Sequence, residues 1–241
     1  HIPGAIFFDL DASSDPDSPL PHMLPSPAAF ARRMGALGLS DSDELVIYDG
    51  SGANLSAARV WWMFRVFGHP QVAVLDGGLG KWRAENRPLE RGAVTLPPGQ
   101  FSARFTRSMV RDLESVRANL EHPREQLVDV RSADRFTGRV PEPRPGLRQG
   151  HIPGSRNLPF TELVAPDGTI LPDRHLRDRL QAAGIDISQP IVATCGSGTS
   201  ACALVLTLEL LGHRNTAVYD GAWSEWGSRA DTPVVAGDQE S

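Results

Sequence analysis

Hydrophobic residues form two kinds of segment along the chain: short runs rich in β-branched residues, and longer apolar or amphipathic stretches. The short runs predict strands and the longer stretches predict helices. Because the two kinds alternate, they predict an α/β fold with parallel sheets that helices flank on both faces. We expect strands at residues 45–48, 73–75, 127–130, 191–194 and 217–219, and helices at residues 53–67, 109–120 and 200–211.

The chain also repeats its own sequence, which predicts a tandem duplication of one α/β domain. Three segments occur twice, in the same order in both halves. They are the tetrapeptide HIPG, a strand-like run that ends in Gly-Ser-Gly, and a segment that begins with Gly-His and ends with Trp. The paired segments are residues 1–4 and 151–154, 45–52 and 191–198, and 68–82 and 212–226.

A proline-rich segment separates the two copies. The consecutive prolines at positions 97 and 98 cannot continue a helix or a central strand, so we expect a linker at about residues 88–105. The predicted domains are residues 1–105, linker included, and residues 106–241. The second copy has a predicted strand before its HIPG motif, whereas the first copy begins directly with that motif. We therefore expect the first domain to lack its first strand.

Composition and charge argue against several classes of protein. A net charge of −5 and an isoelectric point near 5.8 provide no basic footprint for nucleic acid or anionic membranes. No apolar run approaches the roughly 18–20 residues of a membrane span. No His/Cys cluster has ligand spacing, so we expect no metal and no cofactor. Two cysteines cannot form a disulfide framework, which favours a reducing, cytoplasmic location.

One of these cysteines, Cys195, lies between a predicted strand and a predicted helix. Gly196 and Gly198 allow the backbone to curl around the sulfur, and Thr199 or Ser200 can cap the following helix. Amide groups of such a loop converge on an anion at its centre, so the thiol should have a lowered pKa and act as a nucleophile. The alternative is that Cys195 is a small buried hydrophobe.

The duplication serves as an internal control, because the first half has Asp49 where the second has Cys195. The first half therefore cannot perform thiol chemistry, and features that both halves share are more simply explained as scaffold. For Cys202, within the next helix, packing is favoured over a redox role. The shared residues interpreted as scaffold are His1 and His151, the turn residues Asp76 and Asp220, and Trp82 and Trp226.

Arg135 and Arg144 flank a proline-rich segment that occurs in the second half only. Proline stiffens the loop, and arginine pairs with carboxylates through a rigid fork of donors, so these two residues suit a carboxylate-binding clamp. The alternative is a solvated surface loop in which the arginines pair with Glu142 or Asp134. Spacing alone leaves both interpretations open.

The sequence resembles the 3-mercaptopyruvate sulfurtransferases of the two-domain rhodanese superfamily. The loop Cys-Gly-Ser-Gly at residues 195–198 looks like their active loop, and the resemblance covers nearly the whole chain. Thr199 and Ser200 stand where Val-Thr is more usual in the family. The resemblance implies two tandem rhodanese-like domains with a catalytic cysteine in the second only.

The resemblance also implies a reaction. The Cys195 thiolate would attack the sulfur of 3-mercaptopyruvate and release pyruvate. The resulting persulfide would be held by the loop at residues 196–200, until a thiol acceptor such as thioredoxin, or cyanide, removes the outer sulfur. Arg135 and Arg144 match the pair that binds the carboxylate and carbonyl of the substrate.

A serine-protease-like relay is implied as well, formed by Asp11, His22 and Ser197. Asp11 and His22 would reach Ser197 across the junction of the two domains, with His22 about 2.6–3.2 Å from both partners. The alternative is that Asp11 caps a turn and His22 packs beside Pro21.

Three competing functions stay open at this point. Thiosulfate sulfurtransferases bind a dianion and typically carry basic residues in the loop, whereas residues 196–200 are uncharged. Rhodanese-like phosphatases need Cys-x5-Arg, but position 201 is Ala201. A non-catalytic binding module predicts a missing or blocked cysteine, and Cys195 argues against it.

Overall fold

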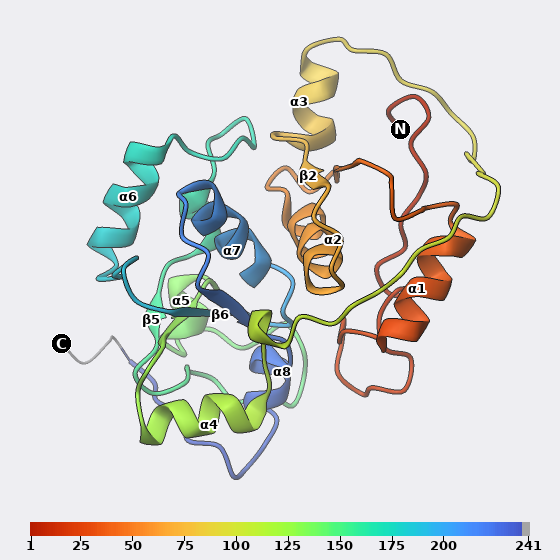
Figure 1. Cartoon of the computed structure of the whole chain (residues 1–241). Helices are drawn as coiled ribbons and strands as arrows, with labels where there is room; N and C mark the ends of the chain where they lie inside the picture. The colour runs from red at the N-terminus through yellow and green to blue at the C-terminus, as the bar shows by residue number, and fades with distance from the viewer. Residues whose placement is uncertain (238–241) are drawn as a thin grey trace.

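The computed structural model describes residues 1–237, and its two halves each contain a parallel sheet (Figure 1). In the first half β1 (Leu45–Ile47) pairs with β2 (Val72–Val74). In the second half five parallel strands lie in the order β3-β7-β6-β4-β5. The predicted tandem α/β fold is therefore confirmed. The five strands are β3 (Val110–Arg111), β4 (Gln126–Asp129), β5 (Arg156–Asn157), β6 (Ile191–Thr194) and β7 (Thr216–Tyr219).

Helices connect these strands. Two helices predicted from the sequence form within two residues of the expected bounds, as α2 (Leu55–Val66) and α7 (Ala201–Leu210). Several other helices were not predicted. They are α1 (Pro27–Ala36), α3 (Gly78–Ala84), α5 (Ala133–Phe136), α6 (Asp173–Ala182) and α8 (Ala222–Trp226), with 3₁₀ turns η1 (Arg107–Met109) and η2 (Phe160–Leu163).

The helix expected at residues 109–120 begins later than predicted. Val110 and Arg111 form β3 and pair with β7, and α4 (Leu113–Glu121) follows. Asp112 sets this boundary, because its side chain accepts a hydrogen bond from the backbone N–H of Ser115 and caps the first turn. A β-branched residue and a capping carboxylate thus override the helical hydrophobic pattern at this end.

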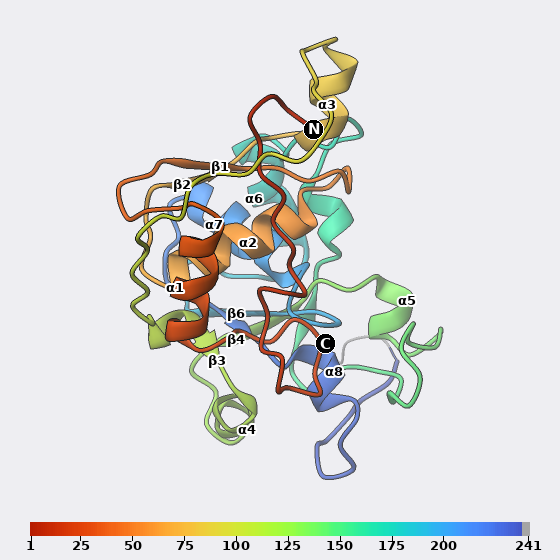
Figure 2. The ribbon, with the colours of Figure 1, turned by 90° about the vertical axis from the view of Figure 1, so that its right-hand side faces the viewer.

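The five-stranded sheet is buried on both faces, as its continuous apolar strands predict. Side chains that alternate along the strands separate into two clusters. One cluster packs against α6 and α7, and the other packs against α4 and α8, which lie on opposite sides of β6 (Figures 1 and 2). Cys195 follows β6 directly, at the carboxyl end of a central strand.

The two halves share one hydrophobic core, in which α2 packs against α7. Both helices are apolar on nearly all sides, as expected for helices buried between two sheets. The active-site candidate loop before α7 therefore faces the first half. On the opposite face of the two-stranded sheet, Val46 is 66% exposed. Within residues 1–237 no helix is both long and apolar enough to cross a bilayer.

The shared histidines fix loops, as the duplication predicts. The His151 ring stacks on Phe136 and its Nδ1 lies 2.8 Å from the Phe136 carbonyl oxygen. The His1 ring contacts the carbonyl oxygens of Ile2 and Gly92 at 3.0 and 2.8 Å. Both residues are scaffold in this structure.

Candidate active site

The loop that follows β6 leaves its backbone donors open. The carbonyl oxygens of Cys195 and Gly196 accept hydrogen bonds from the N–H groups of Trp223 and Ser224, both at 2.9 Å. Within residues 1–237 the N–H groups of residues 196–200 have no hydrogen-bond partner. Residues outside the loop thus hold it through its carbonyl oxygens, and its backbone N–H groups remain available to an anion.

Both loop glycines have close neighbours, and the backbone around Gly198 requires glycine at that position. Gly198 has φ +75°, and a Cβ on it would lie 2.9 Å from the Asp220 carbonyl oxygen. A Cβ on Gly196 would lie 2.9 Å from Nη2 of Arg135. Cys195 itself is only 1% exposed, so the thiol lies within the fold rather than at its surface.

The prediction that Thr199 or Ser200 caps α7 through its side chain is wrong. Ser200 occupies the N-cap position but has helical backbone angles and makes no side-chain cap hydrogen bond. The Thr199 hydroxyl instead lies 3.2 Å from Nδ1 of His22 in the first half. Contact across the domain junction replaces the local cap.

The structure brings Asp11, His22 and Ser197 together. His22 Nδ1 lies 3.2 Å from the Ser197 hydroxyl, and His22 Nε2 lies 3.2 Å from a carboxylate oxygen of Asp11. These partners fit a neutral ring that carries its proton on Nε2 and accepts from the hydroxyls of Ser197 and Thr199 at Nδ1. The Asp11 side chain is 87% exposed, so solvent weakens its contact with His22.

The pKa of His22 is lowered from its ordinary value. Burial is the largest cause, and the positive charges of Arg59 and Arg144 act in the same direction. The Asp11 carboxylate opposes them by raising the pKa. His22 is therefore neutral at pH 7, as a hydrogen-bond acceptor for Ser197 must be.

Arg135 lies beside the cysteine loop and is held there by Glu142. Its Nε donates to the Glu142 carboxylate at 3.2 Å, and its Nη2 pairs with the other oxygen. Glu142 also forms an ion pair, at 2.8 Å, with the fully buried Arg131. Arg131 pairs with Asp129 as well. The predicted ion pair of Arg135 with Glu142 is confirmed, and Arg135 also lies beside Gly196. Its role in binding a substrate carboxylate stays a prediction. Its Nη1 has no hydrogen-bond partner in residues 1–237.

Arg144 is exposed, and its charge reaches His22, whose pKa it lowers. Arg135 of α5 therefore brings positive charge beside the loop, and Arg144, in the segment after α5, brings positive charge to His22. Cys202 is buried, with its sulfur 3.3 Å from the Gly198 carbonyl oxygen, and burial raises its pKa to about 12. Cys202 therefore stays protonated and serves packing.

No group of three metal-binding side chains occurs among the described residues.

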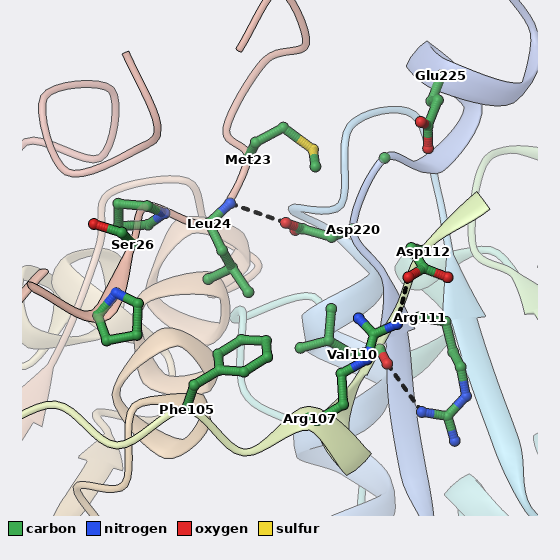
Figure 3. Close-up of a pocket in the computed structure, with 13 residues that line it drawn as sticks. Met23, Leu24, Ser26, Phe105, Arg107, Val110, Arg111, Asp112, Asp220 and Glu225 are labelled. Carbon is green, nitrogen blue, oxygen red and sulfur yellow. Dashed lines mark hydrogen bonds and ion pairs between the residues drawn. The ribbon is translucent and has the colours of Figure 1, made fainter. Parts of the chain in front are cut away.

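Sequence reasoning missed Arg59 and Asp220, which pair at 2.8 Å beneath the loop. The available signal for Arg59 was a charged residue within the apolar stretch of α2, where Arg65 near the end of the helix is the other one. Asp220 was interpreted only as a turn residue. Its Oδ2 accepts a hydrogen bond from the N–H of Leu24, at 2.9 Å, across the junction (Figure 3).

A cavity of about 370 Å³ also opens at this junction (Figure 3). Met23, Leu24 and Phe105 supply apolar walls, and Arg107 at its edge is paired with Asp112. No predicted site residue is among the described residues that line it. The cavity is therefore distinct from the cysteine loop.

Comparison with known proteins shows similarity over both halves. The model of the rhodanese-like domain matches residues 1–85 and 112–229, on either side of the predicted linker. The chain is 48% identical to the 3-mercaptopyruvate sulfurtransferase of Rattus norvegicus, over 98% of this chain and 80% of the rat protein. It is 44% identical to the mitochondrial thiosulfate/3-mercaptopyruvate sulfurtransferase 1 of Arabidopsis thaliana, over 100% of this chain and 69% of the plant protein.

A solved structure agrees with these sequence relatives. SseA from Escherichia coli, a 3-mercaptopyruvate sulfurtransferase with the rhodanese fold, superposes with a TM-score of 0.84 at 44% identity. The similarity covers 93% of this chain and 84% of SseA. Sequence and structure thus lead to the same family.

Proposed function

The chain belongs to the rhodanese-like family, and we propose that it transfers sulfur from 3-mercaptopyruvate through a persulfide on Cys195. The observation that carries this proposal is the cysteine loop, where a thiol is surrounded by unpaired backbone donors and flanked by Arg135. Relatives at 44–48% identity are named for the same reaction.

The chemistry begins with the Cys195 thiolate, which attacks the sulfur of 3-mercaptopyruvate. A sulfur–sulfur bond forms, the carbon–sulfur bond breaks, and its electron pair leaves on carbon as pyruvate enolate. The proton of the substrate thiol ends on that carbon, so the products are pyruvate and an anionic persulfide. The open N–H groups of residues 196–200 are suited to stabilise this negative charge.

The flanking residues fit two further tasks. Arg135 and Arg144 would bind the carboxylate and carbonyl of the substrate, for which Arg135 has an unpaired Nη1. Ser197 would pass the proton to the enolate, oriented by its 3.2 Å contact with His22. Asp11 would orient the ring through Nε2.

A thiol would complete the cycle by attacking the outer sulfur of the persulfide, which returns Cys195 as thiolate. Thioredoxin is one such acceptor, and cyanide can replace it in an assay. A reducing compartment such as the cytoplasm suits this step, because both cysteines are free thiols.

Mass spectrometry of the intact protein tests this proposal. Incubation with 3-mercaptopyruvate without an acceptor should add one sulfur atom to Cys195 and release one equivalent of pyruvate. The variant Cys202→Ser should still gain the sulfur, whereas Cys195→Ser should not. A mass gain that persists in Cys195→Ser, or no gain in the unmodified protein, would disprove the assignment.

Thiosulfate is the second candidate donor, since the Arabidopsis relative is named for both donors. Residues 196–200 carry no basic side chain to neutralise a dianion. We therefore expect a higher kcat/KM with 3-mercaptopyruvate than with thiosulfate in a steady-state comparison. The reverse ratio would make thiosulfate the principal donor.

A further inference from the structure

A buried arginine from the first half contacts the backbone of His22 and of Gly198, the residue that follows Ser197. Arg59 lies on α2 and is 0% exposed. Its Nη1 donates to the carbonyl oxygen of Gly198 in the cysteine loop, at 3.3 Å. Its Nη2 donates to the carbonyl oxygen of His22 and pairs with Asp220 at 2.8 Å. One guanidinium therefore joins three segments that are distant in sequence.

The backbone at His22 needs such support. His22 has φ +60°, a left-handed conformation that is unfavourable for a residue with a side chain. Arg59 holds the carbonyl of His22, and Asp220 accepts from the N–H of Leu24 two residues later (Figure 3). The Arg59–Asp220 pair thus fixes the chain directly after the Cα that carries the imidazole.

The same pair fixes the opposite partner of the imidazole. Gly198 directly follows Ser197, and its Cα lies so close to the pair that a Cβ would be 3.2 Å from Nη1 of Arg59. The guanidinium of Arg59 therefore holds both the cysteine loop and the His22 segment. The guanidinium is further held by the ring of Trp62, whose centroid lies 4.7 Å from its central carbon.

From these contacts we propose that Arg59 is a positioning residue, which sets the distance between His22 and Ser197 by gripping both backbone segments. This rests on the proposed function, in which that distance governs proton transfer to the enolate. A buried ion pair is weak evidence for a stability role, because apolar residues of similar size often stabilise a core as well. Hydrogen bonds to two backbone carbonyls of the site, together with the ion pair to Asp220, point to orientation.

Charge gives the proposal a second readout. The titratable and charged groups that act on His22 are Asp11, Arg59 and Arg144. Arg59 lowers the pKa of His22, so its removal should raise that pKa. A neutral side chain at this position would not lower it, so the shift reports that the guanidinium lies near the imidazole.

The experiment uses the full chain and a matched control on the same helix. Arg65 also lies on α2 and also pairs across the junction, with Glu209 of α7 at 3.2 Å, but it contacts no proposed site residue. Lysine at position 59 keeps the charge beside Asp220, but its donors start from one nitrogen and do not reproduce the two-nitrogen fork with which Arg59 reaches two carbonyls and a carboxylate. Arg59→Lys should lower kcat with 3-mercaptopyruvate roughly 10- to 100-fold, with KM little changed. Arg65→Lys should keep kcat within about 2-fold.

Two measurements separate positioning from general damage. Alkylation of Cys195 by iodoacetamide should proceed at the same rate in Arg59→Lys and Arg65→Lys. In a protein that already carries His22→Ala, Arg59→Lys should lower kcat no further, because both changes impair the same proton-transfer step. Equal losses in the two lysine variants, slower alkylation in Arg59→Lys alone, or an undiminished loss in the His22→Ala background would overturn the proposal.

A substrate-free measurement keeps this proposal separate from the proposed function. The double variant Arg59→Met, Asp220→Asn removes both buried charges together, so neither is left unpaired. NMR titration of the His22 ring should show a raised pKa in this variant and not in Arg65→Met. An unchanged His22 pKa, or failure of both Arg59 variants to fold, would overturn positioning by Arg59. Absence of pyruvate formation in the unmodified protein, with the NMR shift present, would overturn only the proposed function.

Discussion

The two halves carry the same strand–loop–helix unit, but they satisfy its backbone donors differently. In the first half the Asp49 carboxylate fills its own loop. It accepts from the N–H of Ser51, the hydroxyl of Ser51 and the N–H of Ala57, at 2.9, 2.8 and 2.9 Å. In the second half Cys195 occupies this position, and the N–H groups of residues 196–200 have no partner within residues 1–237.

This difference shows how one scaffold gives a closed loop and a receptive loop. A carboxylate is a permanent anion that the loop donors can bind internally. A protonated thiol carries no charge and is a poor acceptor. The backbone N–H groups of the second loop therefore stay free for a negative charge that arrives with the substrate. The first half then contributes in another way, through side chains such as His22 and Arg59 that cross the junction.

The largest expected effect comes from removing the sulfur that distinguishes the second loop. Cys195→Ser should reduce sulfur transfer by at least about 10³-fold, because an alcohol is neither ionised nor thiophilic at neutral pH. Pyruvate release from 3-mercaptopyruvate measures it, and circular dichroism checks that the fold is intact. More than trace turnover in this variant would mean that the two loops do not differ in the way described.

The contribution of the first half is tested by His22→Ala. We expect turnover to fall about 10²-fold, the low end of general acid–base catalysis, while alkylation of Cys195 keeps its rate. The acid limb of the pH profile, which the lowered pKa of His22 places below the ordinary histidine range, should vanish. Unchanged turnover would reduce His22 to a structural residue of the junction.

The charge around the open loop is tested by Arg135→Ala and Arg144→Ala. Each should lower kcat/KM for 3-mercaptopyruvate about 10- to 100-fold, since a charge-assisted hydrogen bond is lost. Reaction of Cys195 with neutral iodoacetamide should be nearly unaffected. Equal losses with both reagents would show that the arginines support the loop structure instead.

Arg144→Ala has a second, smaller consequence that Arg135→Ala lacks. Arg144 lowers the pKa of His22, so its loss should raise that pKa. His22 would then become protonated at a higher pH, and the acid limb of the kcat profile should move to higher pH. A limb that stays in place, measured at saturating substrate, would show that Arg144 does not act on the imidazole.

The sequence was sufficient to predict features encoded by local pattern and by repetition. The buried strands and the helices α2 and α7 follow from continuous apolar runs, and the comparison of Asp49 with Cys195 singled out the candidate loop. The start of α4 was missed, because the capping carboxylate of Asp112 decides it locally.

Contacts across the junction could not be predicted from pattern. Asp76 and Asp220 end equivalent strands, and each accepts a backbone N–H from the opposite half, of Ile170 at 2.8 Å and of Leu24 at 2.9 Å. Likewise, Arg59 contacts Gly198, 139 residues away. Such pairs depend on how the two halves pack against each other. The hydrophobic periodicity within either half carries no information about that packing.

The smallest expected effect concerns the closed loop. Asp49→Ala removes an acceptor for two backbone N–H groups, one of them Ala57 in the first turn of α2. Loss of such a cap should lower the free energy of unfolding by about 1–2 kcal/mol, and so lower Tm by roughly 2–8 °C. Activity of the folded protein should stay within about 2-fold, because Asp49 contacts no proposed site residue. Calorimetry and steady-state kinetics on one preparation measure both quantities. A large loss of kcat with unchanged Tm would mean that the closed loop takes part in the reaction, and the contrast between the two halves would fail.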